Sequence, residues 1–193
     1  MRTANSPRLI AFDTSAAHCA AALLVGPRIV TRVDDMAKGQ AEHLMPMLED
    51  MLQAEGLAWA DMDAIGVGIG PGNFTGIRIA VSAARGLALG LGNQAIGISG
   101  FEMRAWGEPR PYTATIPAPR EASYAQTFDN DGTAPAIMQD IAAGPQKPMD
   151  QLISAAAQIA ATRIGQDLPK PAPLYLRAAD AAPPKDPAPV ILP

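Results

Sequence analysis

The chain has little of what a secreted, metal-binding or nucleic-acid-binding protein usually requires. It contains one cysteine, Cys19, so no disulfide can form within it, which fits a reducing cytoplasm. It contains two histidines, and aromatic residues make up only 5% of its 193 residues. Its net charge of −4 provides no basic excess for binding nucleic acid unaided. We therefore expect any contact with RNA to be indirect.

Long hydrophobic runs are also lacking. No apolar run reaches the length of a membrane span, and residues 1–7 carry Arg2 and no hydrophobic stretch. We therefore expect no membrane segment and no signal peptide. Apolar residues nevertheless make up 48% of the chain, which is long enough to bury a substantial core in one domain or two small lobes. A cytoplasmic globular protein is the resulting prediction.

Glycine and proline divide the chain in two. Of its 17 glycines, 13 precede residue 107, whereas 15 of its 19 prolines lie from residue 107 onward. The first half has the apolar patterns of alternating strands and helices, which predicts a mixed α/β sheet carrying helices. The expected strands are 8–14, 18–25, 28–34, 64–69 and 94–98, and the expected helices are 40–55 and 75–91.

The second half gives weaker signals. Residues 111–116 and 123–128 have the composition of short strands, and residues 149–164 that of an amphipathic helix. Beyond residue 178 the chain is rich in proline and alanine, typical of a tail with little fixed structure. We predict an N-terminal lobe over 1–106, a reduced C-terminal lobe over 107–178, and a tail over 179–193.

The most specific pattern is a glycine-spaced strand that ends in a tight turn and then begins a helix. Such a junction presents free backbone N–H groups and the positive end of a helix dipole, which suits an anion or a closely packed partner. It equally suits a purely structural turn with Thr75 as the helix N-cap. The turn consists of Gly70-Pro71-Gly72-Asn73-Phe74-Thr75-Gly76.

The two predicted helices of the first half have patterns of their own. Residues 40–55 carry a core stripe together with additional methionines, whose flexible side chains suit an adaptable contact surface. Residues 75–91 are rich in small side chains, which let another helix approach closely. The sequence alone leaves open whether both helices only pack on the sheet. The small residues are Ala80, Ala83, Ala84, Gly86 and Ala88.

Several motifs together resemble the bacterial TsaB (YeaZ) family, a branch of the actin-like ATPase superfamily with its ribonuclease H-like fold. The similarity is strong over residues 8–105 and weak over 107–172. The motifs are Leu9-Ile10-Ala11-Phe12-Asp13-Thr14-Ser15, Ala41-Glu42-His43-Leu44-Met45-Pro46-Met47-Leu48, the glycine turn continued through Ile77-Arg78, Ala83-Ala84-Arg85-Gly86-Leu87-Ala88, and Pro173-Leu174-Tyr175-Leu176-Arg177.

The resemblance implies a two-lobed fold with a shortened C-terminal lobe. It also implies a non-catalytic scaffold in the synthesis of N6-threonylcarbamoyladenosine at tRNA position 37. TsaB relatives bind TsaD, which transfers the threonylcarbamoyl group, and TsaE docks on the pair; alone they form homodimers, and tRNA is reached only through the complex. Carried to this sequence, the partner interface comprises Leu44, Met45, Leu48, Arg78, Ser82 and Arg85.

The same resemblance bears on catalysis and cofactors. TsaD-like relatives hold a metal with two histidines at positions that correspond here to Gly100 and Arg104, neither of which is an ordinary metal ligand. His18 and His43 have no matching partners. We expect no intrinsic cofactor, with an adenine nucleotide only at the TsaD boundary. The alternatives are a glycoprotease-like metallopeptidase of the peptidase M22 type or an independent ATPase.

A nucleotide or anion site, if this chain has one, would lie at the first loop and the glycine turn. Actin-like ATPases place an aspartate near the metal and hydroxyl groups near phosphate in the loop that corresponds to residues 13–15. The structural alternative, which we favour, is that Asp13 and Thr14 satisfy local backbone groups at the strand end. The candidate residues are Asp13, Thr14, Ser15, Gly70, Gly72 and Thr75.

Overall fold

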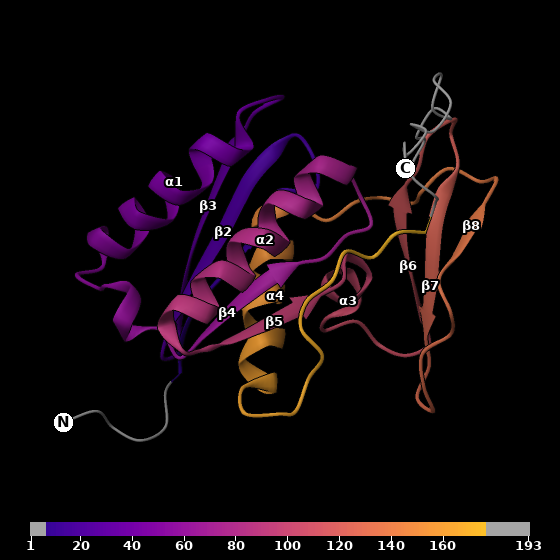
Figure 1. Ribbon diagram of the computed structural model, residues 1–193. Coiled ribbons are helices and arrows are strands. Elements are labelled where there is room, and N and C mark those ends of the chain that lie inside the picture. Colours follow the sequence, from indigo (N-terminus) through magenta and orange to yellow (C-terminus); the bar gives the residue numbers. More distant parts are fainter. Residues whose placement is uncertain (1–6, 177–193) are drawn as a thin grey trace, which may run out of the picture.

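The computed structural model describes residues 7–176, which form two sheets lying side by side (Figure 1). The larger sheet has five strands in the order β3-β2-β1-β4-β5, with β1 antiparallel to β2 and parallel to β4. Its strands are β1 (Arg8–Asp13), β2 (His18–Val25), β3 (Arg28–Asp35), β4 (Ala64–Gly68) and β5 (Gln94–Ile98). The smaller sheet is antiparallel and contains β6 (Tyr112–Pro117), β7 (Ser123–Phe128) and β8 (Ile137–Gln139).

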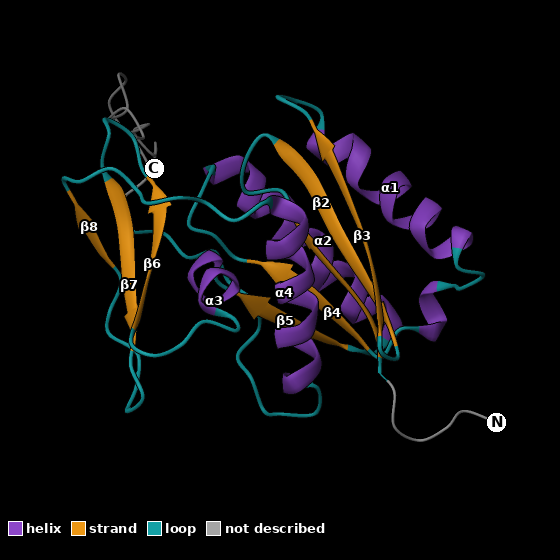
Figure 2. Cartoon of the chain, turned by 180° about the vertical axis from the view of Figure 1, so that it is seen from behind, coloured by secondary structure: helices purple, strands orange, loops and turns teal. Residues whose placement is uncertain are grey.

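Helices cover both faces of the larger sheet, so the prediction of a mixed sheet carrying helices is confirmed. The helices are α1 (Gln40–Ala54), α2 (Phe74–Leu91), α3 (Gly100–Ala105) and α4 (Met149–Arg163), and a short 3-10 turn, η1 (Trp59–Asp61), precedes β4. In Figure 1, α1 and α2 lie on the near side of the sheet and α4 lies behind it; Figure 2 shows α4 from its own side.

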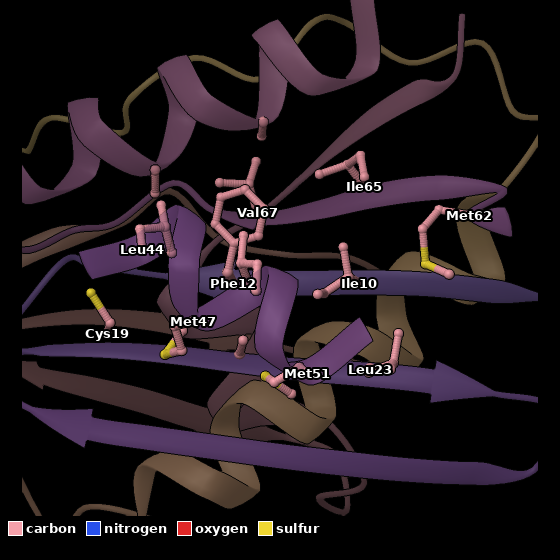
Figure 3. Packing of buried hydrophobic residues seen from close by; sticks show 14 of the residues in the cluster. Ile10, Phe12, Cys19, Leu23, Leu44, Met47, Met51, Met62, Ile65 and Val67 are labelled. Carbon is pink, nitrogen blue, oxygen red and sulfur yellow. The ribbon is translucent and has the colours of Figure 1, made fainter. Parts of the chain in front are cut away.

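The first core lies between the sheet and helices α1 and α2 (Figure 3). Alternate residues of the central strands face it, because successive side chains in a strand point to opposite faces. Ile10 and Phe12 of β1 are 0% exposed and belong to the same cluster as Leu44 and Met47 of α1. The apolar stripe predicted for the first helix is therefore its core-facing side.

The second core lies between the other face of the sheet and α4, and its residues are smaller. Ala11 and Ala20 from the strands are fully buried in the same cluster as Ala157 and Ala160 of α4. At Gly66, an added Cβ would come within 2.9 Å of the Ala11 Cβ and 3.2 Å of the Ala160 Cβ. Alanine and glycine on this face therefore let one helix lie close against several strands.

The second lobe is smaller than the sequence predicted. We assigned residues 107–178 to it, but α4 packs on the larger sheet, so the boundary at residue 106 is wrong for that helix. Helix α3 and strand β8 were not predicted. Helix α3 has a detectable signal, because Ser99 and Glu102 form a reciprocal capping box at its start. The predicted tail at 179–193 lies outside the described residues.

Helix α2 overturns one expectation about hydrophobic length. Among residues 7–176 it is the one helix long and apolar enough to cross a membrane, judged by length and composition, and 33% of its apolar window is buried. The expectation that no stretch reaches this length was therefore wrong. In the structure α2 lies against the larger sheet, with Ile77, Ala80 and Ala84 at most 1% exposed in the first core.

Candidate functional site

The loop that follows β1 is closed by its own hydrogen bonds. The Asp13 carboxylate accepts from the Ser15 backbone N–H at 2.8 Å and from the Ser15 hydroxyl at 2.7 Å. The His18 ring lies 3.1 Å from the same oxygen, and Asp13 is 3% exposed. Burial opposes ionisation of Asp13, but the hydrogen bonds from His18 and Ser15 outweigh it and lower its pKa.

The glycine turn packs directly on this loop. Thr14 donates its hydroxyl proton to the Gly76 carbonyl oxygen at 2.6 Å, and the Asn73 N–H donates to the Ser15 carbonyl oxygen at 2.6 Å. A Cβ added at Gly72 would lie 2.4 Å from the Ser15 carbonyl oxygen, and one at Gly76 would lie 1.9 Å from that of Thr14. These glycines are required because two backbone segments approach each other too closely for a side chain.

The start of α2 differs in detail from the prediction. Asn73, not Thr75, is the N-cap, because its side-chain oxygen accepts from the Gly76 N–H at 2.9 Å. Thr75 is exposed within the first turn. Gly70 has a φ of 93°, and a Cβ there would lie 2.6 Å from the Ile77 Cδ1. The turn therefore positions the start of α2 against the sheet.

A cavity of about 680 Å³ lies beside this loop and turn, between the two lobes. Of the residues predicted for an anion site, Asp13, Ser15 and Gly72 line it, whereas Thr14, Gly70 and Thr75 do not. The remaining walls come from α3, β6, β7, α4 and the segment that follows α4. The structure thus brings together half of the predicted site, in a cavity that needs residues far apart in the sequence.

Gly100 and Arg104, which the family resemblance matched to metal-ligand positions, lie one helical turn apart on α3. Both line the cavity, and the guanidinium Nη1 of Arg104 donates to the Gly100 carbonyl oxygen at 2.9 Å. A Cβ at Gly100 would lie 3.3 Å from the same Nη1 atom, so the arginine lies where a side chain at residue 100 would begin. Burial lowers the pKa of Arg104, and the charge of Asp13 partly offsets this effect.

Both histidines are held by carboxylates. His18 pairs with Asp13, and the His43 Nε2 lies 2.7 Å from Asp34 Oδ2. Across residues 7–176, no group of three or more His, Cys, Asp or Glu side chains is arranged to hold a metal ion. Each histidine therefore takes part in a local pair that positions a loop or a helix start.

The predicted partner interface divides into buried and exposed residues. Leu44 and Leu48 are 1% and 0% exposed in the first core, so assigning them to a partner surface was wrong. Met45 is half-buried against that core. Ser82 and Arg85 are exposed on α2. The predicted interface residues that are exposed therefore lie on α2 and not on α1.

Arg78 is exposed on α2 but already has partners. Its guanidinium lies 3.7 Å from the centre of the Phe74 ring, and its Nε donates to the Tyr175 hydroxyl at 2.8 Å. The Phe74 and Tyr175 rings are stacked with their centres 4.9 Å apart. The Tyr-Leu-Arg element recognised in the sequence thus ties the C-terminal segment to the start of α2. Its last residue, Arg177, lies outside the described residues.

The outer face of α2 has small residues at regular spacing. Of the small residues predicted to admit a second helix, Ala80, Ala84 and Ala88 face the sheet instead and are at most 6% exposed. Ser82, Gly86 and Gly90 are exposed at intervals of four residues, and a Cβ at either glycine would meet nothing within 4 Å. Beside them Leu89 is 85% exposed. We call Ser82, Arg85, Gly86, Leu89 and Gly90 the outer α2 face.

Comparison with known proteins supports one family. The model of the TsaD family, tRNA N6-adenosine threonylcarbamoyltransferase, matches residues 34–145, more than half of the chain. The tRNA threonylcarbamoyladenosine biosynthesis protein TsaB of Escherichia coli is 34% identical over 108 residues, which cover 56% of this chain and 47% of that protein. The TsaB of Haemophilus influenzae is 36% identical over 99 residues, covering 50% of this chain and 41% of that protein.

A solved structure extends the likeness over most of the fold. YeaZ from Pseudomonas aeruginosa superposes with a TM-score of 0.68 at 25% identity, covering 88% of this chain and 100% of that chain. The chain spans about half the length of the curated relatives that it matches. Together the sheet order and this superposition show that the chain has the fold of YeaZ, a mixed sheet with flanking helices and a smaller second sheet. The chain belongs to the TsaD-like proteins and, among them, to the TsaB (YeaZ) family.

Proposed function

We propose that this chain is a non-catalytic subunit in the biosynthesis of threonylcarbamoyladenosine in tRNA, and that it binds TsaD through the outer α2 face. The observation that carries the proposal is that this face is sterically open and exposes a large apolar side chain, Leu89. Leu89 is 85% exposed, and nothing lies within 4 Å of a Cβ added at Gly86 or Gly90. The names of the relatives supply the pathway.

The spacing of the small residues suits a helix as the contacting element. Residues four apart lie on one side of a helix, so Ser82, Gly86 and Gly90 form a shallow groove along α2. A ridge of side chains from a partner helix would fit such a groove at an interaxial distance of about 8 Å. Leu89 would then be buried at the centre, and Arg85 would lie at the polar rim.

The absence of a catalytic role is proposed from the side chains at the two metal-ligand positions. Gly100 has no side chain, and the Arg104 guanidinium carries no lone pair for a metal. The hydroxyls of Thr14 and Ser15 already donate within the chain. The chain would thus act through its surface, with any adenine nucleotide held at the boundary with TsaD and tRNA bound by the complex.

Other associations are proposed to use the same surface. In the absence of TsaD, the outer α2 face of one copy would pack on that of a second copy, giving a homodimer that TsaD displaces. A TsaE-like protein would then join the pair formed with TsaD. The shared use of one surface predicts that a single substitution weakens both the homodimer and the complex with TsaD.

The test is co-purification with TsaD of the same organism, followed by size-exclusion chromatography. Gly86→Trp should reduce complex formation at least about tenfold, because a large side chain would block the groove. Gln151→Trp places the same side chain on an exposed site of α4, on the opposite face of the sheet, and is the matched control. Circular dichroism should show both variants folded.

Two results would overturn the proposal. One is a Gly86→Trp variant that is folded and binds TsaD as tightly as the wild type. The other is metal-dependent peptidase activity or ATP turnover by the isolated chain that is lost on Asp13→Ala. The first would remove the outer α2 face from the interface, and the second would make the chain an enzyme.

A further inference from the structure

The cavity between the lobes has features that partner binding through α2 does not use. Its volume of about 680 Å³ lies within the usual range of small-molecule sites, roughly 300–1,000 Å³. Its walls are mostly apolar and come from both lobes and from the segment that follows α4. The apolar residues include Phe74, Met103, Ile116, Met149 and Leu174.

Arg104 provides the cavity with a fixed cationic group. Its Nε donates to the Gln146 Oε1 at 3.0 Å, and its Nη1 donates to the Gly100 carbonyl oxygen at 2.9 Å. Both neighbours are neutral, so the guanidinium charge is not cancelled by a direct ion pair. Among the described residues, its Nη2 has no hydrogen-bond partner, and Arg104 lines the cavity.

Asp13 and His18, which also line the cavity, are paired with each other. Asp13 accepts hydrogen bonds from Ser15 and lies beside the ring of His18. On the other side of Asp13, a Cβ at Gly68 would lie 1.8 Å from its Oδ2, so that oxygen lies close to the backbone of β4 at Gly68. Oδ1 of Asp13 is thus fully engaged, and of the Lys and Arg side chains among the described residues Arg104 is the one that lines the cavity.

An aromatic wall faces the same space. Phe74 and Tyr175 line the cavity, and their stacked rings hold the C-terminal segment against α2. The neighbouring Leu174 N–H donates to the Ile69 carbonyl oxygen at 2.8 Å, which fixes the segment to the end of β4. The cavity is therefore a formed site with apolar and aromatic walls and one oriented guanidinium.

We propose that this cavity binds a small organic carboxylate with an apolar body. Its carboxylate would accept hydrogen bonds from Arg104, and its body would contact Phe74, Met103 and Met149. A guanidinium matches a carboxylate because its N–H groups form a planar fork. A nucleotide polyphosphate fits less well, because the hydroxyls of Thr14 and Ser15 are engaged and, among the described residues, Arg104 is the one Lys or Arg side chain that lines the cavity.

The cavity methionines allow a direct test on the full chain. With methionine methyl groups labelled with carbon-13, the protein is titrated with 3-phenylpropionate, with 3-phenylpropan-1-ol as the neutral match and with inorganic phosphate. The signals of Met103 and Met149 should move with 3-phenylpropionate. Met51 and Met62, buried in the first core on the other face of the sheet, are internal controls and should not move.

Substitution of the arginine sharpens the test. Arg104→Gln should raise the dissociation constant of 3-phenylpropionate roughly tenfold or more, because a charge-assisted hydrogen bond is lost. Arg104→Lys keeps the charge but not the fork and should have an intermediate effect. The wild-type comparison of acid and alcohol needs no variant, so the proposal remains testable if Arg104→Gln does not fold.

Three outcomes would overturn the proposal. The first is that Met103 and Met149 do not respond to 3-phenylpropionate at about 10 mM, where even a millimolar ligand would be mostly bound. The second is that the alcohol binds as tightly as the acid, which would remove the role of Arg104. The third is that inorganic phosphate produces the same shifts, which would make the site a general anion site. Each outcome is independent of whether TsaD binds to α2.

Discussion

Helices α2 and α4 lie on opposite faces of one sheet and follow the same rule on their inner sides. Both place small residues against the strands, such as Ala84 of α2 and Ala157 of α4, each 0% exposed. Their outer sides differ. On α4 the outward residues are polar, and Gln158 accepts a hydrogen bond from the Trp106 indole at 2.7 Å. On α2 the outer face has two glycines and an exposed leucine.

The difference shows that the small residues on the inner side of a helix and the residues on its outer side have separate causes. An alanine-rich inner side is needed wherever a helix must lie close to strands, so it carries no information about partners. A polar outer side, as on α4, is the ordinary solvated surface of a covering helix. Exposed glycines inside a helix cost about 1 kcal/mol each relative to alanine, so their presence on α2 calls for a reason. Close approach of a partner is the reason that we propose.

The largest effect should come from placing a tryptophan on the inner side of α2 instead of on its outer side. Ala84→Trp inserts an indole into a fully buried position and should destabilise the fold by about 3 kcal/mol or more, through overpacking. Gly86→Trp, two residues further along, should change stability by less than about 1 kcal/mol, because its Cβ meets open space. Urea unfolding followed by circular dichroism measures both. Equal destabilisation by the two variants would break the distinction between inner and outer sides.

The next effect concerns the loop after β1, which packs against the start of α2. Helix α4 has no corresponding loop. The hydrogen bonds of Asp13 hold this loop, whereas the N-cap of α4, Pro148, makes no side-chain hydrogen bond. Asp13→Asn should cost about 2 kcal/mol at pH 7, because a buried acceptor of three groups is replaced by an amide. Unfolding free energies of the wild type and the variant, measured from pH 3 to pH 8, give the comparison.

The pH dependence of that difference has a definite sign. Burial raises the pKa of Asp13, but the hydrogen bonds from His18 and Ser15 lower it by a larger amount. The folded-state pKa is therefore below the unfolded value. The carboxylate therefore stabilises the fold above the unfolded pKa of about 3.9, and the contribution is lost as the pH falls through the folded-state pKa. The difference in the free energy of unfolding between the wild type and Asp13→Asn should decrease below about pH 4. A difference that increases there would contradict the assigned hydrogen bonds.

A smaller effect should follow from removing the helix cap. Asn73→Ala deletes the side-chain oxygen that accepts from the Gly76 N–H and should cost about 1 kcal/mol, a typical value for an N-cap. Thermal unfolding with Asn73→Asp as the matched control, which keeps the acceptor, separates the cap from other effects of the substitution. If both variants lose the same stability, the cap has been misassigned.

The smallest effect is expected at Leu89. Because its side chain is 85% exposed, Leu89→Ser should change the free energy of unfolding by less than about 0.5 kcal/mol. Ile153→Ser on α4 replaces a residue that is 0% exposed and should be strongly destabilising. Denaturant unfolding of this pair compares an outward with an inward apolar residue. A loss of more than about 1 kcal/mol at Leu89 would show that it packs in the isolated chain.

The sequence predicted the larger sheet more accurately than the rest of the chain. The bounds of β2, β5 and β7 agree with the prediction, because their apolar runs end at clear turns or polar residues. Strand β8 has only three residues, too few for a pattern, and α3 was missed although its capping box was present. Periodicity located α2 but did not identify its inner side, since alanine and glycine differ little in hydrophobicity.

The functional regions were predictable to different degrees. The loop at Asp13 and the glycine turn were recognised from local motifs, and the structure places them together. The cavity was not predicted, because it forms only where α3, α4 and the segment with Tyr175 meet. Arg104 was noted only as a residue unsuited to bind metal. Its orientation depends on Gln146, 42 residues away, a contact that no local pattern reveals.

The central claim, that the outer α2 face contacts TsaD, is tested most directly by thiol protection. Cys19 is buried, and burial together with the charges of Asp34 and Asp13 raises its pKa to about 11, so it does not compete for a thiol reagent. The rate of modification is compared for Leu89→Cys and Gln151→Cys, with and without saturating TsaD. We predict at least about tenfold protection at residue 89 and none at residue 151, because only the first position would be buried. Unchanged modification at residue 89 while TsaD is bound would contradict the claim.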